Sequence, residues 1–174
     1  MKLVLQRVTS ASVSISKEKF SDINRGILVF FCAEKGDDES QAYFLADKTL
    51  NLRIFSDDRG KMNFSCVDVG GDILVVSQFT LAGDCSRGRR PGFDKAADSD
   101  TAQKLYQYYV DCFIYKKDQL KNYPYQYKSH MYYLQQLYLN TIKPGNMQYS
   151  NVVMYVTGLQ PAKLMYSINY HLRS

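Results

Sequence analysis

The sequence predicts an α+β domain, and three observations carry this prediction. Short apolar or alternating runs are typical of strands, two longer segments have the apolar spacing of helices, and turn signals separate them. A chain of 174 residues is long enough to bury a substantial core. We therefore expect residues 1–174 to form a single domain.

The strand signals come mainly from the first part of the chain. Residues 4–8 and 13–15 alternate well enough for pleated strands, and the continuous apolar run at 27–32 is typical of a central strand. Residues 73–76 predict a further strand that is covered on both faces and leads directly into Ser77. Turns are predicted at 57–60 and 69–72.

Two helices are predicted from capping residues followed by an apolar stripe. Asp37 or Asp38 can cap a helix that ends near Asn51, and Asp98 or Ser99 can cap a second helix. The predicted inner stripes are Ala42, Leu45, Ala46 and Thr49 in the first helix, and Ala102, Leu105, Tyr109 and Phe113 in the second.

Charge and tyrosine content change near residue 112. Residues 1–111 contain 15 Lys and Arg against 16 Asp and Glu, whereas residues 112–174 contain seven against one. Fourteen of the 15 tyrosines follow residue 105, and both histidines lie in the last third of the chain. This shift predicts a boundary near residue 112, followed by an atypical basic, tyrosine-rich segment.

The residues that end the predicted strand at 73–76 are the best candidates for chemistry. Ser77, Gln78, Phe79 and Thr80 lie where backbone amides are free to meet a ligand. Arg87, Arg89 and Arg90 follow within a short turn, and such a density of guanidinium groups suits phosphate. On composition alone, a packed strand end with a solvated basic turn is the competing interpretation.

Other classes of site are less well supported. The four cysteines are widely separated without a Cys-x-x-Cys pair, so we expect reduced thiols rather than a disulfide or metal site. Scattered acidic residues resemble caps and turns, which predicts chemistry without a metal or cofactor. No run approaches the roughly 18 apolar residues of a membrane span, and the amino terminus starts directly with a strand pattern. We therefore expect a cytoplasmic protein.

Residues 1–111 closely resemble the D-aminoacyl-tRNA deacylase family, also called D-tyrosyl-tRNA deacylase. Seven blocks occur in the family's order and at its spacing, which makes chance agreement implausible. The blocks are residues 1–13, 26–30, 48–55, 60–63 (Gly-Lys-Met-Asn), 68–71, 76–82 (Val-Ser-Gln-Phe-Thr-Leu-Ala) and 88–93 (Gly-Arg-Arg-Pro-Gly-Phe). The resemblance implies a mixed, largely antiparallel, barrel-like sheet with two or three packed helices.

The resemblance also implies an activity and partners. The family hydrolyses the ester that links a D-amino acid, or glycine mischarged on the tRNA for alanine, to the terminal adenosine of tRNA. Its members are homodimers that complete each other's sites. Such esters are labile, so positioning and oxyanion stabilisation can supply much of the acceleration without a strong nucleophile.

The resemblance assigns roles to the residues of the 76–82 block. The amides near Gln78 and Phe79 would polarise the ester carbonyl, Leu81 would help to bind the substrate, and Ser77 would shape the strand exit. Thr80 occupies the position proposed in the family as a nucleophile or as an orienting hydroxyl. We favour the orienting role, because no histidine lies within the first 129 residues. The 2′-hydroxyl of the terminal adenosine is then an alternative base.

Arg7 has two interpretations. A single arginine in an alternating strand is often an exposed charge, whereas the family's corresponding arginine supports a second active-site motif. That second motif is an Asn-x-Gly-Pro-Val-Thr segment whose cis peptide reaches the partner subunit and excludes L-amino acids.

This chain departs from the family at that second motif, because it contains no Gly-Pro dipeptide. The nearest stretches are residues 145–148 and 154–158, with Pro144 before and Pro161 after them. No residue here is assigned the gateway role, which leaves chiral selection and the dimer open.

Three accounts of residues 112–174 remain. In the first, these residues are diverged family elements, with a helix over 131–141 and a strand over 151–156. In the second, they form an RNA-binding surface rich in tyrosine and in positive charges. The third account is a segment in an altered reading frame, which the abrupt end of the resemblance favours.

The leading function is a D-aminoacyl-tRNA deacylase, and the alternative is an RNA-binding relative without efficient cleavage. A Ser-His-Asp hydrolase is disfavoured, because the chain has two histidines and no Gly-x-Ser-x-Gly elbow.

Overall fold

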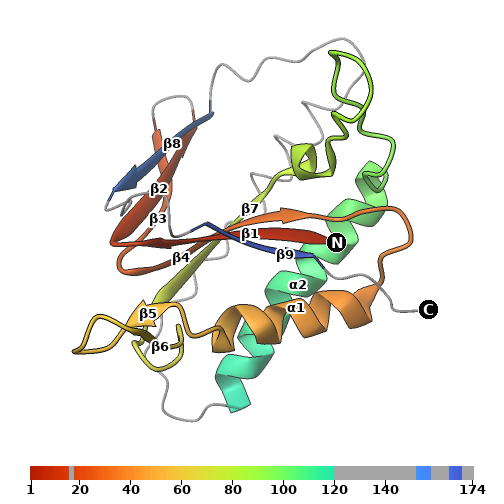
Figure 1. Ribbon diagram of the computed structural model, residues 1–174. Helices are drawn as coiled ribbons and strands as arrows, with labels where there is room; N and C mark the ends of the chain where they lie inside the picture. Colours follow the sequence, from red (N-terminus) through yellow and green to blue (C-terminus); the bar gives the residue numbers. More distant parts are fainter. Residues whose placement is uncertain (16–17, 120–151, 158–164, 170–174) are drawn as a thin grey trace.

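The computed structural model describes residues 1–15, 18–119, 152–157 and 165–169 (Figure 1). Within these residues, a mixed and largely antiparallel α+β fold confirms the predicted fold class. Its central layer is a sheet with the strand order β7-β4-β1-β9. These strands are Asp72–Ser77 (β7), Gly26–Cys32 (β4), Lys2–Val8 (β1) and Met165–Asn169 (β9).

Strand β4 lies in the centre, as its continuous apolar sequence predicts. It pairs with β1 in the antiparallel and with β7 in the parallel direction, so that Phe31 lies opposite Ser77 and Cys32 opposite Lys2. Its side chains alternate between two cores. Ile27, Val29 and Phe31 belong to the core on the helix side, and Leu28 belongs to the core on the opposite side.

A second sheet covers the opposite face and has the order β3-β2-β8 among the described strands. These strands are Glu18–Ile23 (β3), Ser10–Ile15 (β2) and Val152–Thr157 (β8). Strand β3 was not predicted, because its charged residues hide a weak alternation in which Ser21 and Ile23 are buried. Strand β2 begins earlier than expected because Ala11, a small residue, also faces the core.

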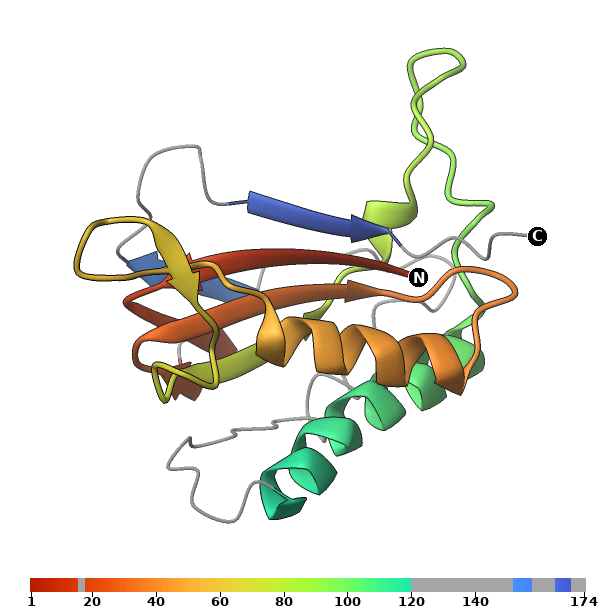
Figure 2. The same ribbon diagram turned by 60° about the horizontal axis from the view of Figure 1, so that its bottom comes forward.

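Helices α1 (Glu39–Asn51) and α2 (Ser99–Gln119) pack on the other side of the central sheet (Figure 2). Asp38 caps α1 through a capping box with Gln41, and the Asp98 carboxylate accepts a hydrogen bond of 3.0 Å from the Thr101 amide. The two helices are joined by a buried 2.8 Å hydrogen bond between the Thr49 and Tyr109 hydroxyls. Both predicted helices and their inner stripes are confirmed.

The change in composition near residue 112 falls within helix α2. Helix α2 continues across it to Gln119, and Cys112 and Phe113 are buried in the core. Strand β8 pairs with β2 and strand β9 with β1, so two segments of the last third belong to the sheets. Such pairing is what the account of diverged family elements requires. The helix expected at 131–141 lies outside the described residues.

Candidate active site

The predicted site begins where β7 gives way to a short 3-10 helix, η1 (Phe79–Ala82). Gln78 is the N-cap residue, and its backbone amide donates a 2.7 Å hydrogen bond to the Phe31 carbonyl. This bond extends the parallel pairing of β4 and β7 by one residue. The expectation that the Gln78 amide is free for a ligand is therefore wrong.

The amides of Phe79 and Thr80 take its place as candidate donors. The first N–H groups of a helix have no acceptor within the helix. Gln78 provides no side-chain cap to η1, and no described residue accepts a hydrogen bond from either amide. Phe79 is half-buried and Thr80 is exposed, so an external acceptor can reach this end of the helix. Two adjacent N–H donors at a helix start suit a developing oxyanion.

The Thr80 hydroxyl accepts a hydrogen bond from the side-chain amide of Gln78. Among the described residues, no carboxylate or imidazole forms a hydrogen bond with this hydroxyl. A threonine without a base is a weak nucleophile, whereas a hydroxyl held by a neighbouring amide can still orient a substrate. The geometry therefore supports the orienting role for Thr80. Leu81 lies half-buried on the same helix, and Ser77 ends β7.

Cys32, the last residue of β4, lies against η1. This contact was not predicted from the sequence. The Cys32 Sγ atom is 3.6 Å from the Phe79 carbonyl oxygen. Burial, reinforced by the nearby Glu34 carboxylate, raises the pKa of this thiol to about 11. The thiol therefore stays protonated at neutral pH and serves as packing beneath the helix rather than as a nucleophile.

The three arginines lie on a projecting hairpin that follows η1, residues 84–92, here called the basic arm (Figure 2). Asp84 and Gly92 exchange backbone hydrogen bonds of 2.8 and 2.9 Å at its base. The Asp84 carboxylate accepts a hydrogen bond from the Ser86 amide and forms a 3.3 Å ion pair with Lys95. These contacts lower the pKa of Asp84 to about 2, and the hydrogen bonds from Ser86 contribute more than Lys95 does.

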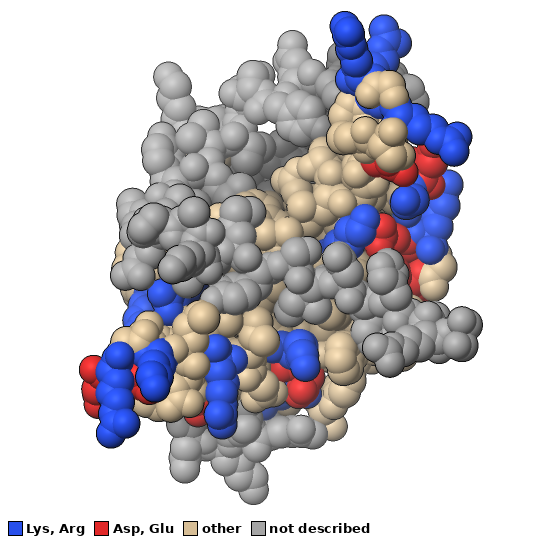
Figure 3. Space-filling view, viewed as in Figure 1, with Lys and Arg blue, Asp and Glu red and all other residues tan. Residues whose placement is uncertain are grey.

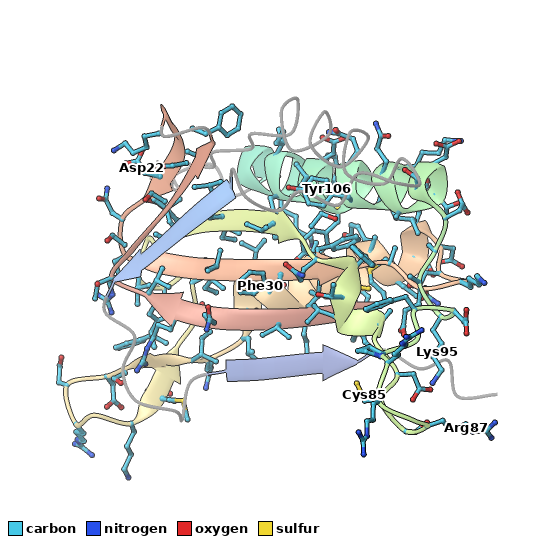
Figure 4. The ribbon with its side chains drawn as sticks, turned by 90° about the horizontal axis from the view of Figure 1, so that it is seen from above. Asp22, Phe30, Cys85, Arg87, Lys95 and Tyr106 are labelled. Carbon is cyan, nitrogen blue, oxygen red and sulfur yellow. The ribbon has the colours of Figure 1, made fainter. Side chains whose placement is uncertain are left out.

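The side chains of the basic arm point away from the body of the protein. Figure 4 shows Arg87 at the outer end and Lys95 nearer the base, and Figure 3 shows a concentration of basic atoms there. Arg87, Arg89 and Arg90 are exposed, and none forms an ion pair with a described residue. Guanidinium groups without protein partners are available to bind phosphate.

Arg7 lies at the opposite end of the central sheet. It pairs with Ile27, whereas Ser77 lies opposite Phe31, which places Arg7 roughly 13 Å further along β4. Its guanidinium is not an exposed strand charge, because the half-buried side chain donates hydrogen bonds to the Ile54 carbonyl at 2.6 Å and the Ser56 hydroxyl at 3.3 Å. The structure does not bring Arg7 to the Ser77–Thr80 segment of the same chain.

A family model described as D-Tyr-tRNA(Tyr) deacylase matches residues 4–136. This chain belongs to that family. The match extends beyond residue 111, where the resemblance seen in the sequence ends. A D-aminoacyl-tRNA deacylase from Pelobacter propionicus is 56% identical over 110 residues, which cover 63% of this chain and 76% of the relative. One from Geotalea daltonii is 55% identical over 109 residues, which cover 63% and 73%.

Solved structures agree with this family fold. A structure titled "c-Myc DNA Unwinding Element Binding Protein" has a TM-score of 0.71 and 27% identity, and the match covers 98% of this chain and 99% of that one. A probable eukaryotic D-amino acid tRNA deacylase has a TM-score of 0.54 and 20% identity over 64% of this chain and 65% of that one, which supports the fold alone.

The family's gateway motif has no counterpart in the described structure. Residues 154–157, which echo part of it, lie in β8 beside β2. Residues 145–148, Pro144 and Pro161 lie outside the described residues. Among the described residues, no cluster of three His, Cys, Asp or Glu side chains is arranged to hold a metal ion, and no helix is long and apolar enough to cross a membrane.

Sequence reasoning also missed the role of Phe93. This residue belongs to the 88–93 block but was assigned no function. Its ring lies against Phe79, with ring centroids 5.3 Å apart and an angle of 64° between the ring planes. Membership of a family block was the available signal, but contact with η1 could be seen only in the structure.

Proposed function

We propose that this protein hydrolyses the ester between a D-amino acid and the terminal adenosine of tRNA, the activity for which its curated relatives are named. The observation that carries the proposal is the pair of amide donors at the start of η1, at the exit of β7. They would stabilise the oxyanion that forms when water attacks the ester carbonyl. The 3′-oxygen of the adenosine then leaves and takes up a proton.

The side chains around these amides support positioning rather than nucleophilic attack. Thr80 would orient the substrate, Phe79, Leu81 and Ser77 would shape the site, and Cys32 stays protonated below it. The 2′-hydroxyl of the substrate adenosine would activate the attacking water. Glycyl-tRNA, including glycine mischarged on the tRNA for alanine, would also be a substrate, since glycine has no side chain to exclude.

The basic arm would bind the tRNA through its phosphates. Its three arginines project next to η1 and have no described protein partner, which supports contact with a polyanion close to the reacting ester. Phosphate contacts position a nucleic acid without reading its sequence. We also propose that the protein acts in the cytoplasm as a homodimer, as the family resemblance implies, with Arg7 supporting the partner's contribution.

Cleavage of D-tyrosyl-tRNA and L-tyrosyl-tRNA, measured side by side, tests the activity. Cleavage of the D form alone supports the deacylase with a substitute for the gateway. Cleavage of both supports catalysis without chiral exclusion. Cleavage of neither, with salt-dependent tRNA binding, overturns the proposal in favour of the RNA-binding relative, which the missing Gly-Pro motif and the basic last third of the chain favour.

A matched pair of variants tests the amide donors. Phe79→Pro removes the ring and the N–H, whereas Phe79→Ala removes the ring alone. Proline is tolerated at the first position of a helix, and Gln78, with φ −145° and ψ 77°, lies outside the α region that is disfavoured before proline. If the Phe79 amide binds the oxyanion, Phe79→Pro should be slower than Phe79→Ala by about 10²–10³-fold. Equal rates would remove that amide from the mechanism.

A further inference from the structure

The ring of Phe93 joins the base of the basic arm to the helix that carries the amide donors. It packs on Phe79 with an edge-type contact at 5.3 Å. It also closes the far end of η1, because a Cβ atom on Gly83 would lie 3.3 Å from Phe93 Cε1 and 3.0 Å from the Thr80 carbonyl oxygen. The Phe93 ring therefore packs on the first residue of a four-residue helix and lies beside its C-cap residue, Gly83.

The segment that carries Phe93 is fastened to the central sheet. The Ala96 amide donates to the Phe93 carbonyl at 2.9 Å, and the Ala97 amide donates to the Ala33 carbonyl at 3.1 Å. The Lys35 amide donates to the Lys95 carbonyl at 2.9 Å, so the residues after Phe93 are held against the extension of β4. The Phe93 ring thus projects from a fixed frame.

The amide end of helix η1 has few constraints of its own. A 3-10 helix of four residues has poor hydrogen-bond geometry, and Gln78 adds no side-chain cap. Ala82 buries the carboxyl end of the helix, and at the amide end the ring of Phe93 packs on the half-buried ring of Phe79. A shift of this ring would turn the Phe79 and Thr80 amides, and a displacement of about 1 Å can cost 10²-fold in rate.

We propose that Phe93 is a positioning residue, whose ring holds Phe79 so that the amides of η1 point at the ester carbonyl. This inference rests on the proposed function. Phe93 does not contact the reacting atoms, and its effect should therefore appear in the rate of the chemical step. Loss of an interaction made only in the transition state lowers kcat and kcat/KM together.

The test compares Phe93→Leu with wild type on D-tyrosyl-tRNA under saturating and limiting substrate. Leucine retains apolar volume but removes the ring edge, and Phe93→Met serves as a second ring-free variant. We expect kcat to fall by about tenfold or more with KM changed by less than about twofold. Phe93→Tyr retains the ring and should restore most of kcat.

A matched control removes a ring far from the site. Phe64→Leu makes the same change on strand β6 (Met62–Phe64), where the side chain is 38% exposed, and should leave both constants unchanged. Thermal unfolding of every variant is followed in parallel, and rates are compared at a temperature where all are folded.

The outcomes separate this inference from the proposed function. If wild type cleaves the ester and a folded Phe93→Leu or Phe93→Met variant matches its kcat, the positioning role is overturned. A rise in KM alone, or a loss that Phe93→Tyr does not restore, also overturns it. If the wild-type protein does not cleave the ester, the proposed function itself is overturned, and the inference that rests on it falls with it.

Discussion

The Tyr106 hydroxyl donates a hydrogen bond of 2.8 Å to the Val75 carbonyl. Val75 lies two residues before the end of β7, which is the edge strand of the described central sheet. The Val75 carbonyl thus accepts this hydrogen bond from helix α2 instead of from another strand. Burial raises the pKa of Tyr106, so the phenol stays protonated and remains a donor throughout the working pH range. Helix α2 in this way anchors the strand that leads to the candidate site.

Tyr106→Phe should lower the free energy of unfolding by about 1–3 kcal/mol, because it leaves the Val75 carbonyl buried without its donor. Urea unfolding followed by circular dichroism measures this change. Tyr108→Phe is the control, since Tyr108 packs against the same core and forms no hydrogen bond with a described residue. Equal stabilities of the two variants would mean that the bond contributes nothing.

Replacing Arg87, Arg89 and Arg90 together with alanine should raise KM for D-aminoacyl-tRNA while kcat stays nearly constant. The expected rise is about tenfold or more at low salt, and the slope of log affinity against log salt should fall by about 2–3. The matched control removes three charges around the hairpin formed by β5 (Phe55–Ser56) and β6, at Arg53, Arg59 and Lys61. These are exposed and form no ion pair with a described residue. Equal effects of both triple variants would contradict a specific role for the basic arm.

Thr80→Ala should slow ester cleavage only modestly, by about threefold to tenfold, because it removes one orienting hydrogen bond. Thr80→Ser should keep most of the wild-type rate. A substrate that ends in 2′-deoxyadenosine should be cleaved poorly by all three proteins. Cleavage of that substrate at the normal rate would eliminate the 2′-hydroxyl as the base, and a loss of more than about 10³-fold in Thr80→Ala would restore the nucleophile hypothesis.

Gly26→Ala should destabilise the protein by at least about 2–3 kcal/mol, because strands β4 and β7 approach each other too closely at this point for a side chain. An added Cβ atom would lie 2.0 Å from the Asp72 carbonyl oxygen. Gly92→Ala is the control, since its added Cβ atom would have its nearest neighbour at 3.8 Å. Thermal unfolding should separate the two variants clearly, and a wild-type midpoint for Gly26→Ala would refute this packing argument.

Glu34 should make stability depend on pH in the acidic range. Burial alone would raise the pKa of Glu34, but the hydrogen bond from Lys2 and the N-terminal ammonium together hold it below the ordinary value. Lys2 Nζ lies 2.8 Å and the ammonium nitrogen 3.3 Å from the carboxylate, whose side chain is only 15% exposed. A lowered pKa means that this stabilisation is complete above about pH 5 and is lost as the pH falls through the folded-state value.

Glu34→Gln should therefore lose about 1–3 kcal/mol at pH 7 and show a flatter stability curve between about pH 5 and 3. Urea unfolding at several pH values measures this. Asp22→Asn provides a control at the exposed ion pair with Lys19, where the expected change is below about 1 kcal/mol. An unchanged slope in Glu34→Gln would assign the acid sensitivity to other carboxylates.

Local sequence determined the elements and the family. The capping residue Asp38 and its apolar stripe predicted α1, and the continuous apolar run at 27–32 predicted the central strand, because both signals depend on residues that are close together in the chain. The 76–82 block placed the candidate site at the end of β7. Strand β3 was not predicted, since its polar residues weaken the alternation, and neither were the short strands β5 and β6.

Tertiary structure decided which groups of that site are available. The Phe31 carbonyl occupies the Gln78 amide, Cys32 lies under η1, and Phe93 packs on Phe79. It also separated Arg7 from the Ser77–Thr80 segment by the length of a strand. Each of these relationships joins residues that are far apart in the chain, and strand register and packing, rather than any local pattern, set the distances between them.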